Sequence, residues 1–273
     1  MVQESDPVPP FHTVHLDMIG SWNIKFRRGG KKIAMDIQAL TMVDRASTWP
    51  KIVSTNSKDS AYISSLFDKH WLCRYPRPVR EVHDNGGEFT GFEFQELCSS
   101  YGIKAIPTTV KNPSSNSAAE RMHLTAGDML RTMVFSGENW QEEVDAALQS
   151  VAWALRSTVS TMSGYTPGQL IFGKDMIMQN TVIADWEKIK LLKSNAAIES
   201  NARENTSRLS HKYMVGDKML ILINKDDVKS KMDQPTEGPF AIVKVYPSHG
   251  TVKIQRGAYQ EMIHIRRLKP CHE

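Results

Sequence analysis

The sequence predicts an α/β protein in two parts: a mixed sheet covered by helices, followed by a small antiparallel β-barrel. Three strand-like runs come first, and strands alternating with helices follow, an order typical of a mixed sheet with helices on its faces. From residue 214 onward, short β-rich runs are separated by Gly and Pro turns. Between the two parts the chain is polar and helix-prone. We therefore expect a leader, a core domain, a linker and a C-terminal domain at residues 1–10, 11–183, 184–213 and 214–273.

The elements of the first half follow from hydrophobic spacing and turn residues. Three prolines in the first ten residues predict an extended leader. The strand-like runs are FHTVHLDMIG, KKIAMDIQALTMVD and STWPKIVST, and the first two are separated by RRGGKK, a hairpin signal. A helix is expected over SKDSAYISSLFDKHWLCRY, with Ser57 as its N-cap. A short strand around VREVH follows, and FTGFEFQELCSSYG predicts a helix that ends at Gly102.

The second half continues with IKAIPTT as a strand and KNPSSNS as a loop. AAERMHLTAGDMLRTMVF and ENWQEEVDAALQSVAWALRSTV predict two long amphipathic helices. KMLILIN, PFAIVKVY, GTVKIQ and EMIHIRR are the expected strands of the C-terminal domain. Four tryptophans occupy apolar positions, so we expect core packing rather than base stacking for Trp49, Trp71, Trp140 and Trp153.

Charge and cysteine content narrow the function classes. The net charge is +4 overall, but residues 1–185 carry −2 and residues 186–273 carry +6. This distribution is expected if the last third meets a polyanion, although a solvated basic surface is the alternative. The three cysteines are odd in number and never form a CxxC, which argues against a disulfide framework or a zinc site. With no apolar run long enough to cross a bilayer and no signal peptide, we expect an intracellular protein without a membrane partner.

The stretch HDNGGEF, residues 83 to 89, supports two interpretations. Asn-Gly and Gly-Gly are strong turn signals, because both tolerate positive φ. Alternatively, Asp84 ends a strand and is held out toward a ligand. Two more acids have similar ambiguity: Asp17 in HLDMIG could be the outward face of a strand, and Glu120 lies early in a helix. Between Asp84 and Glu120 lie 35 residues, a spacing that means little without the local motifs.

Those motifs resemble the integrases of retroviruses and LTR retrotransposons, in particular of gypsy-type elements. LDMIG around Asp17, MVDRAST at 42–48, HDNGGEF around Asp84 and NPSSNSAAERMH around Glu120 match that family's D,D-35-E catalytic core in order and spacing. STMSGYTPGQLIFGK resembles the segment that closes the core, and VGDKMLI with GPFAIVKVYPSHGTVKI resembles the C-terminal GPF/Y module. The likeness spans most of residues 11–270. It implies an RNase H-like core with a five-stranded mixed sheet, followed by a small SH3-like β-barrel.

The resemblance also implies a reaction. Asp17, Asp84 and Glu120 would be the catalytic and metal-binding residues, with Asp17 bridging two Mg²⁺ ions, Asp84 holding one and Glu120 the other. Two such ions neutralise the attacking and leaving oxygens in phosphoryl transfer, and Mn²⁺ can substitute. The implied function is 3′-end processing and strand transfer of element DNA into target DNA, in the nucleus when host DNA is the target. The implied partners are both DNAs, a homo-oligomer on DNA and a chromatin protein.

Basic and polar residues around Glu120 and in the last domain are the candidates for DNA contact. His123 and Arg131 share the helix face of Glu120 at 3.6-residue spacing, although His123 could equally be half-buried and Arg131 solvated. Cations on the barrel would give sequence-tolerant phosphate contacts. The full set expected to bind DNA is Lys111, Asn116, Arg121, His123, Arg131, Lys244, Lys253, Arg256, Arg266 and Arg267.

Two departures from the family pattern keep a second function class open. The family usually has NPQ-x-N-G before its glutamate, whereas this chain has Ser114 and Ser117 at the Gln and Gly positions, which makes the loop stiffer. The family's N-terminal zinc module has no counterpart in these residues, so no zinc is expected. The alternative is therefore a domesticated, catalytically weak relic that binds DNA or chromatin. A cut-and-paste transposase or nuclease shares the metal chemistry, but the gypsy-like tail argues against it.

Overall fold

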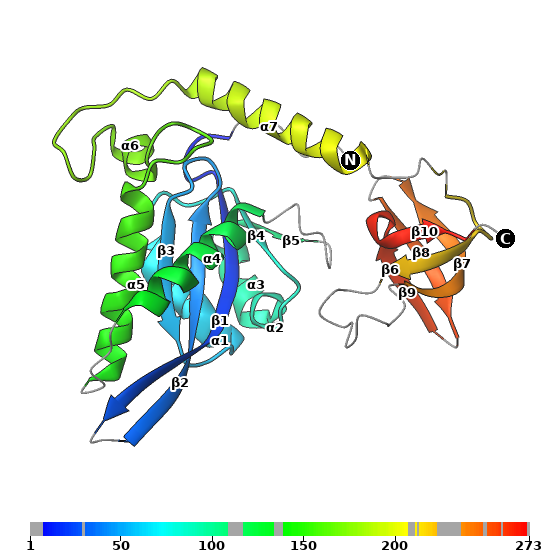
Figure 1. Ribbon diagram of the computed structural model, residues 1–273, viewed down its shortest axis with the longest axis horizontal. Helices are drawn as coiled ribbons and strands as arrows, with labels where there is room; N and C mark the ends of the chain where they lie inside the picture. The colour runs from blue at the N-terminus through cyan, green and yellow to red at the C-terminus, as the bar shows by residue number, and fades with distance from the viewer. Residues whose placement is uncertain are drawn as a thin grey trace. The chain divides into compact units, whose positions relative to one another are not determined.

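The structure of the chain is a computed structural model that describes residues 8–28, 31–108, 117–133, 139–206, 211, 213–222, 236–247, 250–257 and 259–271 (Figure 1). Side chains of some residues inside these ranges, including Glu120, Arg121 and Arg266, lie outside the description. The chain divides between Asn195 and Ala196 into two compact units, which are treated separately below.

The first unit is built on a mixed sheet with the strand order β3-β2-β1-β4-β5 among the described residues. The three strands that come first in the chain pair in an antiparallel manner, and the two short strands add to β1 in parallel. This confirms the predicted five-stranded mixed sheet. The strands are β1 (Thr13–Arg28), β2 (Lys31–Asp44), β3 (Pro50–Thr55), β4 (Arg80–His83) and β5 (Lys104–Pro107).

Helices cover the sheet. Because the side chains of a strand alternate between the two faces, the unit has two separate apolar cores. Leu16 and Met42 pack into one core with residues of α1 and α3, whereas Ile19 and Ala39 pack into the other with residues of α4 and α5. Because neighbouring strand residues point to opposite faces, Asp17 belongs to the α4 and α5 face. The helices are α1 (Ser60–Phe67), the π-helix η1 (Asp68–Leu72), α2 (Gly87–Thr90), α3 (Phe92–Ser100), α4 (Ser117–Thr132), α5 (Trp140–Ser157), α6 (Pro167–Phe172) and α7 (Trp186–Thr206).

Two details of the predicted elements are wrong. The N-cap of α1 is Asp59, whose side chain accepts from Tyr62 N, while the expected cap Ser57 lies two residues earlier and binds Asp59 N. The helix expected to run up to Gly102 is split into α2 and α3 by Gly91, which is extended and packs directly on Ser60. A side chain at that position would collide, so the break depends on the glycine.

The tryptophan prediction holds for only half of the set. Trp49 and Trp71 are buried at 3% and 0% exposure, as expected for core residues. Trp140 and Trp153 on α5 are 38% and 50% exposed: Trp140 is the first residue of the helix, and Trp153 lies on the side opposite the buried residues of α5.

The second unit contains a five-stranded antiparallel sheet with the order β10-β6-β7-β8-β9, which confirms the β-rich C-terminal domain. Its core consists of alternating residues such as Met219, Ile242, Val252 and Ile254. The strands are β6 (Lys218–Leu222), β7 (Thr236–Tyr246), β8 (Thr251–Arg256), β9 (Tyr259–His264) and β10 (Leu268–Pro270), with a 3-10 turn (Ile265–Arg267) before the last.

Helix α7 covers most of the predicted linker and crosses the division between the units. In the described part of the chain, no helix combines the length and the apolar character that a membrane crossing requires.

Candidate active site

Asp17 and Asp84 follow the segment in which β1 and β4 pair as parallel neighbours. In this pairing His15 is opposite Val82, and Asp17 and Asp84 each come two residues later in the chain. Matching positions of neighbouring parallel strands face the same side of the sheet. Both can therefore face a single ligand there, as the catalytic assignment requires.

Asp17 is half-buried against helix α4 rather than simply turned to solvent. Its side chain is 21% exposed, and its Oδ2 lies 3.7 Å from Nδ1 of His123. Thr41 on β2 donates its hydroxyl hydrogen to the carbonyl oxygen of Asp17 at 3.0 Å and also contacts Nε2 of His123 at 3.0 Å. Because Thr41 has a single hydroxyl hydrogen, Nε2 of His123 must be the donor in the second bond.

This hydrogen-bond pattern leaves Nδ1 of His123 turned toward the carboxylate. Burial lowers the pKa of His123 to about 4, so the ring is neutral at physiological pH and Nδ1 presents a lone pair. A lone pair and a carboxylate oxygen that face each other are both acceptors. Such a set of donors suits a bound cation or a bridging water between them.

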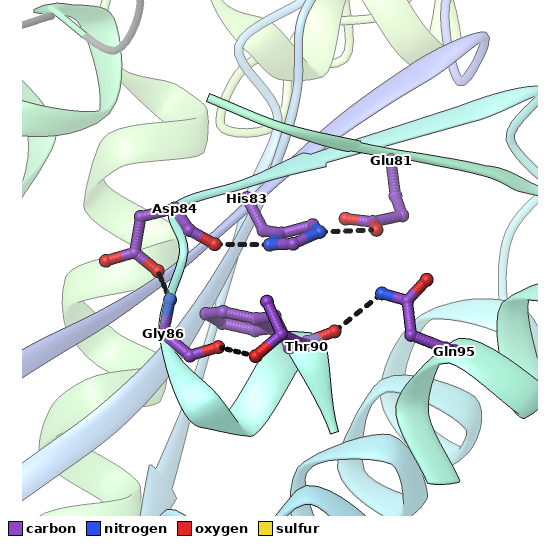
Figure 2. Close-up of polar contacts among 7 residues, drawn as sticks. Glu81, His83, Asp84, Gly86, Thr90 and Gln95 are labelled. Carbon is purple, nitrogen blue, oxygen red and sulfur yellow. Dashed lines mark hydrogen bonds and ion pairs between the residues drawn. The ribbon is translucent and has the colours of Figure 1, made fainter. Parts of the chain in front are cut away.

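Asp84 ends β4 and shapes the turn that follows. Its Oδ1 accepts from Gly86 N at 3.0 Å, and Thr90 Oγ1 donates to Gly86 O at 3.1 Å, so the turn leads directly into α2. The Asp84 side chain is exposed, and its other carboxylate oxygen, which points away from the turn in Figure 2, receives no hydrogen bond from a described residue. HDNGGEF is thus a turn, and it also leaves one carboxylate oxygen of Asp84 open to a ligand.

Gly86 is required at its position by close packing. A Cβ there would lie 2.8 Å from the Glu88 carboxyl group and 3.0 Å from Asp84 Oδ1. Any side chain would therefore push against the carboxylate that Gly86 N holds.

Behind the turn, two ionisable side chains are buried. His83 donates from Nδ1 to the carbonyl oxygen of Asp84, and its ring packs on Phe89 and Phe94 with centroids 5.4 and 6.2 Å away. Glu81, two residues earlier on the same face of β4, places Oε1 3.5 Å from Nε2 of His83 (Figure 2). Burial raises the pKa of Glu81 to about 8.

Glu120 lies in the first turn of α4, and only its backbone is described. Helix α4 packs closely on β1, since a Cβ on Gly127 would lie 3.2 Å from Nε1 of Trp22. His123, one turn after Glu120, is joined to Asp17 through Thr41, so the start of α4 is held beside the strand of Asp17. Among the side chains the structure describes, no group of three or more His, Cys, Asp or Glu is arranged to hold a metal ion, and Glu120 is not among them.

The residues expected to bind DNA have different surroundings. Lys111 and Asn116 lie outside the described residues, as do the side chains of Arg121 and Arg266. His123 faces Asp17, and Arg131 is exposed and pairs with Asp128 on the same helix. Their contact with DNA stays a prediction.

The cations of the C-terminal sheet divide into two kinds. Arg256 pairs with Glu237 and Glu261, and Arg267 donates to Leu222 O at 3.0 Å, so both have structural partners. Lys244 is exposed with its Nζ 5.0 Å from the Tyr246 ring centroid, and Lys253 is half-buried. The structure thus favours the lysines over these two arginines as phosphate contacts.

Sequence reasoning did not find Thr41, Glu81 or the inward position of His83. In VREVH, Glu81 and His83 share a face with Val79, yet Val79 is 53% exposed while Glu81 and His83 are buried, so apolar residues do not mark the inward positions. The only signal was the turn itself: if Asp84 points outward after a strand, the residue before it points inward.

Comparisons with known proteins show what the chain resembles in sequence and in fold. No family model matches the chain. It is 20% identical over 262 residues, 86% of its length, to the retrovirus-related Pol polyprotein from transposon 412 of Drosophila melanogaster, and 35% identical over 127 residues, 44% of its length, to that from transposon TNT 1-94 of Nicotiana tabacum. The chain spans 20% and 9% of these two relatives.

A solved structure shows the same fold over nearly the whole chain. It is the simian T-cell lymphotropic virus intasome in complex with PP2A regulatory subunit B56 gamma, with a TM-score of 0.57 and 17% identity. The match covers 97% of this chain and 80% of that one. The chain is thus similar in sequence to retrovirus-related Pol polyproteins and shares the fold of a retroviral intasome chain.

Proposed function

We propose that the chain is an active integrase that trims the 3′ ends of element DNA and joins them to target DNA by metal-dependent phosphoryl transfer. The observation that supports the proposal is the parallel pairing of β1 with β4, after which Asp17 and Asp84 follow at matching positions, together with the contacts through Thr41 and His123 that join α4 to Asp17. The whole relatives are longer than this chain, so the proposal concerns the activity of this region.

The described side chains fit a hard divalent cation. Carboxylate oxygens are the ligands that Mg²⁺ prefers, and it commonly needs only one or two of them besides water and substrate phosphates. Asp17 and Asp84 supply these, the Nδ1 lone pair of His123 adds an acceptor beside Asp17, and Glu120 would complete the set. When bound, such ions stabilise charge on the attacking and leaving oxygens.

The reaction itself needs no protein nucleophile. In the first step a water oxygen attacks a phosphodiester near the element end; its proton leaves, and the displaced 3′ oxygen takes up a proton. In the second step the freed 3′-OH attacks a target phosphodiester, forming one P–O bond and breaking another. The carboxylates of Asp17, Asp84 and Glu120 would hold the divalent cations that neutralise charge at the reacting phosphate, and Thr41 with His123 fixes Asp17 relative to α4.

The C-terminal sheet would hold DNA through lysines, in particular the exposed Lys244 and the half-buried Lys253. The intasome match concerns a protein assembled on DNA with a host regulatory subunit, and we propose for this chain a homo-oligomer on element and target DNA. Intracellular action, in the nucleus when host DNA is the target, is part of the same proposal.

The test is strand transfer by the chain on a labelled duplex of the element's terminal sequence, in Mg²⁺ and in Mn²⁺. Wild type should give processed and joined products, and Asp17→Asn, Asp84→Asn and Glu120→Gln should each abolish them. Asp36→Asn is the matched control, because Asp36 is an exposed acid on β2 that bonds Asn23. Variants that retain full activity would contradict the assignment.

A relic that binds without chemistry is the second candidate, favoured by Ser114 and Ser117 in place of the family's Gln and Gly. It predicts salt-sensitive DNA binding by wild type with no products in either metal. It also predicts that Asp84→Asn leaves DNA binding unchanged or slightly tighter, since a negative charge is removed.

A further inference from the structure

The buried carboxyl group of Glu81 is unusual for a protein interior. Its side chain is 0% exposed, yet neither carboxyl oxygen has a hydrogen-bond partner. Buried polar groups are nearly always hydrogen-bonded, and exceptions are costly and call for an explanation. The nearest polar group is Nε2 of His83, also buried and also without a hydrogen bond, at 3.5 Å. That distance is at the upper limit for a hydrogen bond.

The hydrogens of this pair can be assigned from its other contact. The carbonyl oxygen of Asp84 only accepts, so Nδ1 of His83 must carry the hydrogen of that bond. Contact between Nε2 and the Glu81 carboxyl is attractive when one further hydrogen lies between them, whichever of the two groups holds it. Glu81, His83 and the Asp84 carbonyl therefore form a directional chain.

The chain of contacts ends at the peptide that aims the Asp84 carboxylate. The Asp84 carbonyl points inward to His83, while the Asp84 side chain points outward and binds Gly86 N (Figure 2). Phe89 and Phe94 fix the plane of the imidazole, and Gln95 donates to Phe89 O at 2.7 Å, which holds α2 in place. Rotation of the Asp84 peptide would thus break the bond to His83.

We propose that Glu81 and His83 are positioning residues that hold the Asp84 peptide from behind and so set the direction of its carboxylate toward a divalent cation. The inference rests on the proposed role of Asp84 in metal binding. Groups that orient metal ligands through hydrogen bonds commonly change metal affinity by about 10- to 100-fold when removed. Neither residue touches the DNA or the reacting phosphate in this account.

Two substitutions of Glu81 with similar volume separate positioning from folding. Glu81→Gln keeps an N–H that can donate to Nε2 of His83, whereas Glu81→Leu keeps the bulk and removes every polar atom. We expect Glu81→Leu to melt at or above the wild-type temperature, since a buried carboxyl without hydrogen bonds is removed, and yet to bind Mn²⁺ about tenfold more weakly. Glu81→Gln should stay within about twofold of wild type in Mn²⁺ affinity.

A second pair of variants tests the other link of the chain. In His83→Asn the side-chain amide can replace Nδ1–H as donor to the Asp84 carbonyl, whereas His83→Leu cannot donate. Mn²⁺ affinity should fall less for the asparagine than for the leucine variant. We expect this order of Mn²⁺ affinities whichever of the two variants has the higher melting temperature.

The measurement is Mn²⁺ binding to the full chain by electron paramagnetic resonance, with melting temperatures recorded on the same samples and Asp84→Asn as reference. Wild-type binding that Asp84→Asn does not weaken would overturn the role of Asp84 and the positioning role with it. Binding that Asp84→Asn weakens but Glu81→Leu leaves within twofold of wild type would overturn the positioning role alone. Equal losses in Glu81→Gln and Glu81→Leu at unchanged melting temperature would also contradict it. Weaker binding in Glu81→Leu alone supports it.

Discussion

Asp44 and Glu81 are both fully buried acids in the same sheet, and they differ in what their carboxyl oxygens contact. Asp44, in the MVDRAST turn after β2, accepts from Phe11 N and Ser47 N, both at 2.7 Å, and from Ser47 Oγ at 2.5 Å. The carboxyl oxygens of Glu81 have no hydrogen-bond partner. Burial raises the pKa of both, but hydrogen bonds counteract the effect only at Asp44. The first acid builds a turn, and the second lies behind the candidate metal ligand Asp84.

The largest expected effect is on stability at Asp44. Asp44→Ala leaves the three donors of Phe11 and Ser47 buried without an acceptor. Each such donor commonly costs about 1 kcal/mol or more, so we expect a loss of about 3 kcal/mol in the free energy of unfolding. Urea denaturation measures it, with the exposed Asp36→Ala as control. A loss under about 1 kcal/mol would remove the contrast between the two acids.

The next effect is a pH dependence that belongs to Glu81. The carboxyl has an ordinary pKa of 4.5 in the unfolded chain and about 8 in the folded protein, where His83 on its own strand and Cys98 on α3 face it. The folded state therefore holds an extra proton between these values, so this contribution to stability is complete below pH 4.5 and is lost as the pH rises toward 8.

Compared with Glu81→Gln, wild type should thus lose stability on the order of 2 kcal/mol between pH 5 and 7. Burial lowers the pKa of His83, so the contribution of His83 to stability increases as the pH rises through the ordinary range of histidine. This contribution is present in both proteins and cancels in the comparison. Denaturation curves at several pH values measure the difference. A constant difference across this window would show that Glu81 is ionised in the folded protein.

A further prediction concerns Asp17, whose surroundings differ from those of Asp84. Asp17 is supported by ordinary hydrogen bonds through Thr41 rather than by a buried ionisable pair. Thr41→Val removes the hydroxyl at nearly constant volume and should lower strand-transfer kcat about tenfold, in line with other groups that orient metal ligands. Thr41→Ser keeps the hydroxyl and should retain most activity. Equal rates for the valine and serine variants would exclude a role for this link.

The smallest effect concerns the cations of the C-terminal sheet. Like the two buried acids, these cations differ in whether they have a polar partner. Arg256 has two glutamate partners, whereas Lys244 has no ion pair with a described residue. Lys244→Gln should make the slope of log K against log salt for DNA binding shallower by about 0.9 without loss of stability. Arg256→Gln should leave the slope unchanged. The opposite result would assign the phosphate contact to the arginine.

The order of strands and helices could be predicted because it depends on local periodicity and turn residues. The mixed sheet and the antiparallel C-terminal sheet follow from runs such as KKIAMDIQALTMVD and PFAIVKVY, and the structure has both. The break at Gly91 could not be predicted, since it depends on contact with Ser60 from a different helix. The exposure of Trp153 depends likewise on which side of α5 is packed, and that of Trp140 on where the helix begins.

For the site, motif order named the three acids, and the structure adds the neighbours that support two of them. Nothing local in the sequence joins Thr41 to His123, which are 82 residues apart. In β4 the polar residues Glu81 and His83 are the buried ones, so the pattern of apolar residues does not mark the inward face of this strand. Such long-range packing decides which of two neighbouring side chains is buried.

The most direct test of the central claim is a crystal of the chain soaked in Mn²⁺, with the metal located by its anomalous scattering. We expect a manganese peak at bonding distance, about 2.0 to 2.2 Å, from carboxylate oxygens of both Asp17 and Asp84. Ordered Asp17 and Asp84 carboxylates with no manganese between them, at Mn²⁺ concentrations that support strand transfer, would contradict it.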